Sequence, residues 1–293
     1  MNPQSKLART KNLLRRVATL VARPKDRQRV IVSLTSYPAR IQYVSRVVRS
    51  LFAQRYLPDM TVLYLSKDQF PMGEKELPAD LRDCLGFDFQ IRWVDGDMRS
   101  HKKYLYAFAD FPGSLIITVD DDIVCRNTLV GELVDGHKRH PDAVVAIRTH
   151  LMKFGDDGLL FPYCEWHMEV GNDRPELCNR PSMALFATSG AGLLFPPDSL
   201  PKAAFDCKAI YETCLNADDV WLKVMSAIAG YPTVALPGWQ GVDCIEGSQD
   251  VSLWSYNRTG GNDLAISKVR EHCEKDLGLA SLDSLLYDPS LLD

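Results

Sequence analysis

The chain has 293 residues, of which 46% are hydrophobic and 25% charged, a composition typical of a globular protein with a full hydrophobic core. Its net charge of −4 is unevenly spread, because residues 1 to 29 carry nine basic side chains against Asp26, which leaves −12 for the rest. An acidic body argues against nucleic acid as a partner, whereas a basic start favours contact with an anionic surface.

Residues 1–28 are expected to form a basic amphipathic helix. Their apolar members share one helical face, with Lys and Arg on the others: Leu7, Leu13, Leu14, Val17, Leu20 and Val21. Such a helix can lie in a membrane interface beside anionic headgroups, here through residues 5–22. The alternative is a basic helix that packs on the body or on another subunit.

Cysteine usage and hydropathy bear on location. The eight cysteines form no Cys-x-x-Cys pair and follow no cleavable signal sequence, which favours reduced thiols in a cytoplasmic protein. No apolar run approaches the ~20 residues needed to span a bilayer. The expectation is a cytoplasmic protein, peripheral on the inner face of the cytoplasmic membrane if the basic helix binds there.

The order of elements over residues 30–94 predicts a doubly wound, mostly parallel sheet. Strands are expected at 30–34, 60–65 and 89–94, with a helix over 41–54. The turn after the first strand holds Thr35, Tyr37 and Arg40, at an edge where such sheets bind nucleotides. These three residues are therefore candidates for base and phosphate contacts. Their alternative roles are a helix start and a surface arginine.

A further helix is expected from about Ser100 to Asp110, with Lys102 and Lys103 in its first turn. Cations at this end oppose the helix dipole, so a nearby anion such as a diphosphate would explain them. The alternative is a pair of solvated lysines.

The fourth expected strand, over 115–119, ends in three consecutive carboxylates, Asp120, Asp121 and Asp122. Carboxylates buried side by side are costly unless a cation or a proton neutralises them. Oxygen ligands of this kind suit a hard divalent metal, and the carboxyl ends of strands are the ligand-binding edge of open α/β sheets. The sequence therefore predicts a metal site here, with a solvated acidic turn as the alternative.

The chain after this strand is less regular. A helix over 127–139 and a strand over 143–147 precede residues 149–183, which are too irregular for a packed layer and predict an excursion over the sheet. Aromatic side chains of the excursion could stack on a sugar, although a small satellite core is favoured: Phe161, Tyr163 and Trp166.

A strand over 184–188 then leads to Gly190 and Gly192, which allow close approach of the backbone to a ligand. A helix capped by Asn216 is expected to run to Ala229, with Asp218 and Asp219 in its first turn, where the helix dipole favours acidic residues. A flexible loop follows, and a last helix starts near Leu264.

Taken in order, these motifs resemble glycosyltransferases of the GT-A fold, similar to the family 2 enzymes and to related bacterial polysaccharide-assembly enzymes. The resemblance spans roughly residues 30 to 265. It rests on four segments: Thr35-Ser36-Tyr37, Asp120-Asp121-Asp122 as an Asp-x-Asp motif, Gly190-Ala191-Gly192 and Ala217-Asp218-Asp219. The last departs from the family's x-Glu-Asp by one acidic substitution.

The resemblance implies a single α/β domain of the GT-A (Rossmann-like) fold, with a mostly parallel central sheet. It would cover residues 29–265, with a nucleotide-binding half over about 29–125 and an acceptor-binding half over about 126–265. A helical tail would follow over 266–293.

The resemblance also implies a metal-dependent, inverting transfer from a nucleotide diphosphate sugar, with a UDP-linked donor favoured. The acceptor would be a hydroxyl of a bacterial glycan or lipid-linked glycan, as in capsule, lipopolysaccharide or exopolysaccharide. Asp122 would be the main ligand of Mn²⁺ or Mg²⁺, while Asp120, assisted by Asp121, would serve ribose or metal.

Asp219 would be the catalytic base that the x-Glu-Asp motif supplies in inverting members. Lys102, Lys103 and Arg258 would stabilise charge on the diphosphate. Many metal-dependent relatives add a late histidine ligand; here only His272 follows Asp219, beyond the expected loop, and Asn257 is a weak substitute.

Two other functions fit parts of this pattern. In a haloacid-dehalogenase-type phosphatase Asp120 would be the nucleophile, Asp122 the acid/base and Asp218-Asp219 the late acidic pair. That nucleophile normally sits on the first strand, whereas three expected strands precede it here. A non-catalytic GT-A binding module is the other alternative, because fold alone does not establish activity.

Overall fold

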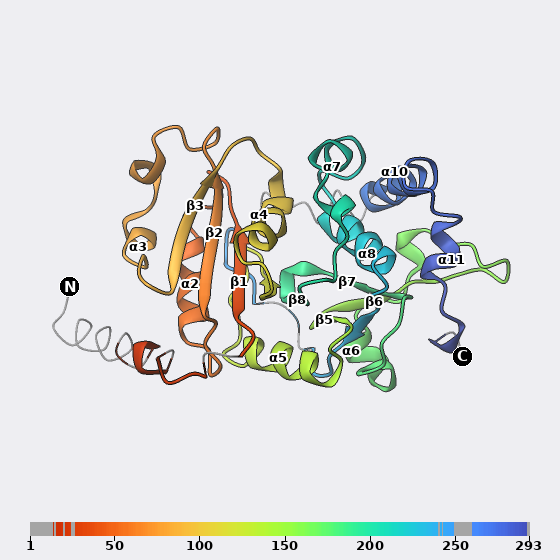
Figure 1. Cartoon of the computed structure of the whole chain (residues 1–293), viewed down its shortest axis with the longest axis horizontal. Helices are drawn as coiled ribbons and strands as arrows, with labels where there is room; N and C mark the ends of the chain where they lie inside the picture. Colours follow the sequence, from red (N-terminus) through yellow and green to blue (C-terminus); the bar gives the residue numbers. More distant parts are fainter. Residues whose placement is uncertain are drawn as a thin grey trace.

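The computed structural model describes residue 14 and residues 16–19, 21–24, 27–239, 241, 243–248 and 260–291. Within these residues a seven-stranded sheet has the order β3-β2-β1-β4-β8-β5-β9, and β6 and β7 form a separate two-stranded sheet (Figure 1). The strands are β1 Val30–Thr35, β2 Met60–Ser66, β3 Phe89–Val94, β4 Leu115–Thr118, β5 Val144–Ala146, β6 Thr149–Leu151, β7 Leu185–Ala187, β8 Leu193–Phe195 and β9 Thr233–Ala235.

The central sheet is buried on both faces, so its strands alternate between two cores. Ile31 packs in one core, whereas Val30 and Val32, its neighbours in β1, pack in the other. Successive side chains of a strand point to opposite faces, and a strand covered on both sides is apolar throughout. This burial explains the continuous hydrophobic runs in the sequence.

Helices cover each face of the sheet (Figure 1). Apolar residues of α2 and α5 belong to one core, and those of α4, α7, α8, α10 and α11 belong to the other. The helices are α2 Val44–Phe52, α3 Ala79–Arg82, α4 Lys102–Asp110, α5 Leu129–Arg139, α6 Val170–Asp173, α7 Cys207–Thr213, α8 Asp218–Ile228, α10 Asn262–Lys275 and α11 Leu282–Leu286.

The expected α/β class and mostly parallel sheet are confirmed, and the arrangement is consistent with a Rossmann-like GT-A domain. β1 pairs in parallel with β2 and β4, β2 with β3, and β5 with β9. The exception is β8, which is antiparallel to both β4 and β5. The sequence analysis predicted neither β8 nor β9, although it predicted β5 and β7, which also have three residues each.

The expectation that residues 149–183 form no packed layer is wrong in part. Leu151 of β6 and Val170 of α6 are buried in a small third core, which also includes Leu185 of β7. The predicted strand at 184–188 is real, but it pairs with β6 instead of joining the central sheet. The favoured satellite core of Phe161, Tyr163 and Trp166 is not separate: Trp166, whose ring lies 5.2 Å from that of Phe186, belongs with Phe186 to the core that α4 and α8 cover, and Tyr163 packs against that core.

The reversed direction of β8 determines which residues meet at the ligand-binding edge. Thr118 at the end of β4 pairs with Leu193 at the start of β8. Because the two strands are antiparallel, the residues that follow β4 and those that precede β8 lie at the same edge of the sheet. Asp120 is therefore brought against the Ser189–Ala191 turn.

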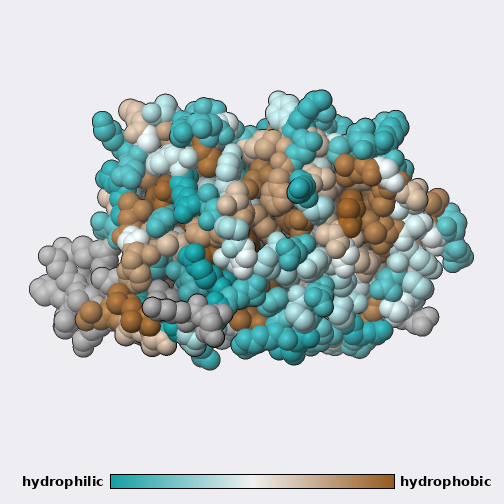
Figure 2. All heavy atoms as spheres, viewed as in Figure 1, coloured by the Kyte–Doolittle hydropathy of each residue, from teal (hydrophilic) through white to brown (hydrophobic). Residues whose placement is uncertain are grey.

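The described part of the basic N-terminal segment contacts the body through arginine. Arg16 is buried, lies 3.5 Å from the Phe52 ring centroid and pairs with Asp88. Leu14, Val17 and Val21 are exposed, and hydrophobic atoms gather beside the grey segment in Figure 2. The expected membrane contact of residues 5–22 stays a prediction, and many of those residues lie outside the described ones. Among the described helices, none is long and apolar enough to cross a bilayer.

Packing of α5 on the sheet generates a stability prediction at Gly192. Its φ of +107° is unfavourable for any other residue, and an added Cβ would lie 2.7 Å from Leu129 Cδ1. Gly192→Ala should cost about 3 kcal/mol in free energy of unfolding, from backbone strain and overpacking. Urea denaturation measures this cost.

Gly113 provides the matched control. Its φ is +73°, and an added Cβ would meet nothing within 4 Å. Gly113→Ala should therefore cost only about 1 kcal/mol. Equal losses in the two variants would contradict the packing role assigned to Gly192.

Candidate functional site

A cavity of about 880 Å³ lies at the carboxyl edge of the central sheet. Its lining includes Thr35 to Arg40 at the end of β1, Asp120 to Asp122 after β4, Thr188 to Ala191 before β8, and the starts of α4 and α8. In a doubly wound sheet, this edge is where ligands bind. The cavity unites most of the candidate residues, although Thr35 and Asp219 are 184 positions apart in the sequence.

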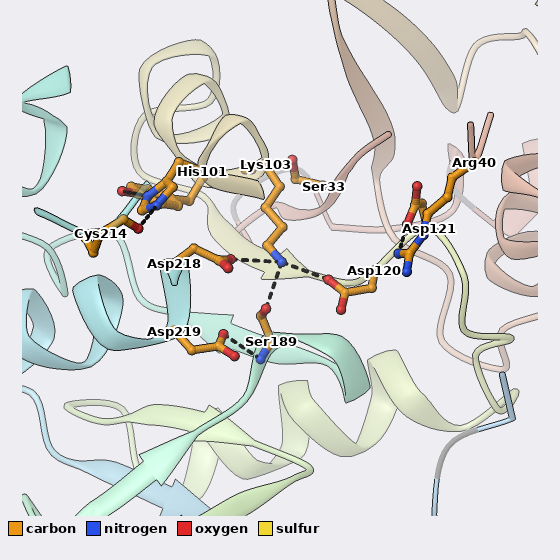
Figure 3. A network of polar contacts seen from close by, with 11 residues as sticks. Ser33, Arg40, His101, Lys103, Asp120, Asp121, Ser189, Cys214, Asp218 and Asp219 are labelled. Carbon is orange, nitrogen blue, oxygen red and sulfur yellow. Dashed lines mark hydrogen bonds and ion pairs between the residues drawn. The ribbon is translucent and has the colours of Figure 1, made fainter. Parts of the chain in front are cut away.

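Lys103 lies at the centre of the cavity's polar network (Figure 3). Its Nζ is 2.8 Å from Asp120 Oδ1 and 3.0 Å from Asp218 Oδ2, and it donates a hydrogen bond of 2.7 Å to Ser189 Oγ. Its side chain is 2% exposed. The expectation of a solvated lysine is therefore wrong for Lys103, which links β4, the turn before β8 and α8.

The charge of Lys103 is maintained by its carboxylate neighbours. Burial lowers the pKa of Lys103, but the nearby Asp120 and Asp218 outweigh burial and raise the pKa above its usual value. Lys102 is equally buried and is ion-paired with Asp97, so it is not a solvated lysine either.

Asp218 and Asp219 have opposite pKa shifts although they are adjacent. Burial raises the pKa of both, but Lys103 outweighs it at Asp218, whose pKa is lowered. Burial and the charge of Asp218 raise the pKa of Asp219 to about 7. Asp219 Oδ1 accepts a hydrogen bond of 2.9 Å from the Ser189 backbone N–H (Figure 3). A carboxylate with a pKa near neutrality is suited to general-base chemistry.

Arg40 and Ser36 hold the other two aspartates. Arg40 Nη1 lies 3.0 Å from both Asp121 Oδ1 and Asp122 Oδ2, and Ser36 Oγ donates to Asp121 Oδ2 at 2.5 Å. Both aspartates are 5% exposed, so the solvated acidic turn is wrong for them. Burial raises the pKa of Asp121. Arg40, whose side chain is 12% exposed, is not a surface arginine.

The two candidate glycines have different surroundings. A Cβ added at Gly190 would lie 2.8 Å from Asp120 Oδ2, so glycine leaves the room that this carboxylate occupies. Gly192 does not line the cavity and instead packs under α5.

Thr35 and Tyr37 line the cavity, and Thr35 Oγ1 donates to the Tyr64 carbonyl at 2.8 Å.

Three other expectations concern the late part of the chain. Asn216 does not cap α8, because the N-cap is Ala217 and the Asn216 side chain accepts from Arg99 instead. Asn257 and Arg258 lie outside the described residues. His272 stacks on Trp221 and pairs with Asp276, and it does not line the cavity.

Several lining residues escaped the sequence analysis. Ser189 bonds both Lys103 and Asp219, yet it drew attention only as part of a glycine motif. Arg148, His150 and Thr188 also line the cavity: His150 lies in β6, and Arg148 and Thr188 flank the same end of the β6–β7 pair. The pairing of β6 with β7 was the missing information, because it brings these residues together.

The carboxylates at the end of β4 offer oxygen ligands to a divalent cation. Among the described residues there is no group of three or more His, Cys, Asp or Glu able to hold a metal. Mg²⁺-type ions at nucleotide sites are usually held by one or two carboxylates together with substrate phosphates. Asp120 and Asp122 therefore fit an ion that enters with a diphosphate and do not fit one held by protein alone.

The charge of the lining favours the same conclusion. Acidic side chains outnumber basic ones among the lining residues: Asp97, Asp120, Asp121, Asp122, Glu169, Asp218 and Asp219 against Arg40, Arg99, Lys102, Lys103 and Arg148. A nucleotide diphosphate would be repelled by excess negative charge unless a cation accompanied it.

Comparisons with known proteins give low sequence similarity. No family model and no curated protein sequence matches this chain. A crystal structure of TarS from S. aureus has 12% identity and a TM-score of 0.46, covering 85% of this chain and 44% of that one. This chain thus spans less than half of that protein.

Two other solved structures are comparably similar. Mannosyltransferase PcManGT from Pyrobaculum calidifontis, in complex with GDP-Man and Mn²⁺, has 14% identity and a TM-score of 0.49, covering 94% of this chain and 80% of that one. The 4-diphosphocytidyl-2C-methyl-D-erythritol synthase from Anaerococcus prevotii has 13% identity and a TM-score of 0.46, covering 79% and 95%.

The raised pKa of Asp219 predicts how stability depends on pH. An aspartate in the unfolded chain has a pKa of about 4, whereas that of Asp219 in the folded protein is about 7. Between these values the folded protein keeps a proton that the unfolded chain has released, so stability falls as pH rises from 4 to 7. Asp219→Asn removes this contribution.

The free energy of unfolding of Asp219→Asn, relative to wild type, should therefore increase by a few kcal/mol between pH 4 and pH 7.5. Urea denaturation across this range measures it. The exposed Asp156 supplies a control, since Asp156→Asn should show no such trend. A difference between Asp219→Asn and wild type that is constant with pH would contradict the prediction.

Proposed function

We propose that this protein is a glycosyltransferase that moves a sugar from a nucleotide diphosphate sugar to a hydroxyl of a glycan or lipid-linked glycan. One observation carries the proposal: a single cavity joins the acidic end of β4 to Asp219, a half-buried carboxylate whose pKa is raised to about 7. A donor-binding edge and a base in one cavity are the two parts that such a transfer requires.

The donor side is assigned to the ends of β1 and β4. Thr35, Tyr37 and Arg40 would contact the nucleotide, since they line the cavity beside the three aspartates. Asp120 and Asp122 would hold Mn²⁺ or Mg²⁺ together with the diphosphate. When bound, the cation would stabilise negative charge on the departing diphosphate. A UDP-linked donor remains the favoured one.

Asp219 is assigned the role of base. It would accept the proton of the acceptor hydroxyl while that oxygen attacks the anomeric carbon from the side opposite the diphosphate. The new glycosidic bond forms as the bond to the diphosphate breaks, so the configuration inverts. The Ser189 N–H fixes one oxygen of Asp219 at 2.9 Å, which orients the carboxylate.

The phosphatase alternative is less well supported by the fold. Asp120 follows the fourth strand of the chain, and Asp218-Asp219 opens a helix instead of following a strand. Robust release of phosphate from a generic phosphomonoester, without any nucleotide sugar, would nevertheless favour the phosphatase over the transferase.

Replacement of the base should remove transfer while leaving donor binding. Asp219→Asn keeps the shape of the side chain and an oxygen for the Ser189 N–H, but it cannot accept a proton at neutral pH. The rate of sugar transfer should fall by about 10²- to 10⁴-fold. Nucleotide affinity, measured by calorimetry, should be unchanged. Transfer at the wild-type rate by a folded Asp219→Asn protein would contradict the mechanism.

Donor and metal should bind cooperatively. Thermal-shift screening of UDP-, GDP-, CMP- and dTDP-linked sugars with Mn²⁺ should identify one nucleotide that raises Tm by on the order of 5 °C at a hundredfold excess over Kd. The nucleotide alone and Mn²⁺ alone should give smaller shifts in Tm. The cation offsets the repulsion between the negative diphosphate and the acidic lining of the cavity, so each binds better when the other is present.

Asp122→Asn should abolish this cooperativity, whereas the Asp156→Asn control should keep it. The outcome that contradicts the assignment is a nucleotide shift of the same size with EDTA as with Mn²⁺.

A further inference from the structure

The two-stranded sheet presents one face to the cavity. β6 pairs with β7 so that His150 is opposite Phe186, and the Thr188 N–H donates to the Arg148 carbonyl at 3.1 Å. Side chains two residues apart on a strand share a face, as do directly opposed residues of the paired strands. Arg148, His150 and Thr188 therefore lie on the same face, and all three line the cavity.

On this face, two buried polar atoms have no hydrogen-bond partner in the described part of the chain. His150 is 1% exposed, and its Nδ1 accepts the Glu169 backbone N–H at 3.0 Å. Burial lowers the pKa of His150 to about 3, so the ring is neutral and carries its proton on Nε2. This N–H, like Thr188 Oγ1, has no hydrogen-bond partner among the described residues. Such atoms reduce stability, so their presence at a cavity points to a ligand.

The orientation of His150 is fixed from behind by Glu169. Glu169 has a φ of +59°, an unfavourable conformation for a non-glycine residue. Its carboxylate is held by Arg148 at 3.1 Å and by Trp239 Nε1 at 3.0 Å. Strained backbone that is stabilised by several contacts is typical of functional sites. Here the Glu169 conformation places its backbone N–H against His150 Nδ1. This hydrogen bond fixes the orientation of the imidazole ring and therefore the position of Nε2.

We propose that His150 and Thr188 form a subsite for an uncharged, hydroxyl-bearing pyranose ring, with His150 Nε2 and Thr188 Oγ1 binding its oxygens. We expect an uncharged sugar because this subsite has no net charge that would attract an anion. Arg148 is ion-paired with Glu169, and His150 is neutral. Tyr163 and Met168 line the same cavity and offer apolar contact to a sugar ring.

The subsite lies on the base side of the cavity. Thr188 is followed directly by Ser189, whose N–H binds Asp219. A sugar held at Thr188 therefore brings its hydroxyls near the base and away from Arg40 and the nucleotide edge. Its identification as the acceptor subsite rests on the proposed function, whereas the binding of a sugar there does not.

Thr188→Val tests the subsite without disturbing the fold. It keeps the β-branched shape and removes only a hydroxyl that has no partner among the described residues, so stability should be unchanged or raised. Thr149→Val is the matched control, since Thr149 Oγ1 is also buried and has no partner in the described part of the chain, but its residue does not line the cavity. His150→Asn keeps an acceptor for the Glu169 N–H and removes the Nε2 donor.

Saturation-transfer NMR is the measurement, with methyl glycosides of glucose, galactose, mannose and N-acetylglucosamine, in the presence and absence of UDP and Mn²⁺. At least one glycoside should bind wild type, and both Thr188→Val and His150→Asn should weaken it about five- to tenfold. Thr149→Val should bind as wild type does. Methyl glucuronoside should bind more weakly than methyl glucoside.

The subsite is wrong if no glycoside binds wild type, if Thr188→Val binds equally well, or if the glucuronoside binds more tightly. The proposed function is judged separately, by transfer from nucleotide sugars. Glycoside binding that depends on Thr188 with no transfer from any donor would leave the subsite standing and overturn the transferase. If the protein transfers sugar and Thr188→Val leaves the acceptor KM unchanged, the transferase proposal stands and the subsite is wrong.

Discussion

The site depends on one buried cation. The Lys103 ammonium lies between Asp120 and Asp218, with Ser189 as its third partner, and is almost fully removed from water. Burial of an isolated ammonium would be prohibitive, and burial of the Asp218 carboxylate without it would also be costly. Asp120, whose side chain is 35% exposed, supplies the second negative charge. Lys103 and Asp218 therefore stabilise one another in their buried positions. The ends of β4 and α8 approach one another because Lys103 compensates the charge between them.

The antiparallel direction of β8 is the second constraint. A parallel strand at this position would send the Ser189–Ala191 turn to the opposite edge of the sheet, away from Asp120. Because β8 is reversed, Ser189 can contact Lys103 and Asp219 at once, and Gly190 can lie against Asp120. A sheet that is otherwise parallel thus gains one turn at its ligand-binding edge that a regular β-α-β order does not supply.

The sequence predicted those parts of the fold that depend on local pattern. Strands such as Val30–Thr35 have continuous apolar runs because both sheet faces are covered, and α2 has apolar residues at helical spacing. It missed β6, β8 and β9, three of the five strands that have only three residues, because so short a run shows no period. With β8 it missed the role of Ser189. The aspartates were found because three adjacent carboxylates are unusual. His150 and Thr188 were not, since only strand pairing places them together.

The neighbouring carboxylates of α8, Asp218 and Asp219, have different surroundings and therefore different pKa values. They are adjacent in the first turn of one helix, where Asp218 is buried and Asp219 is half-buried. Asp218 contacts Lys103, so its charged form is favoured and its pKa is lowered. Asp219 bonds the Ser189 N–H and faces the charge of Asp218, so burial and repulsion raise its pKa to about 7. Two carboxylates whose surroundings separate their pKa values are suited to different tasks. Asp218 can remain ionised and hold Lys103 in place, while Asp219 can exchange a proton near neutral pH because its neighbour already uses the nearby cation.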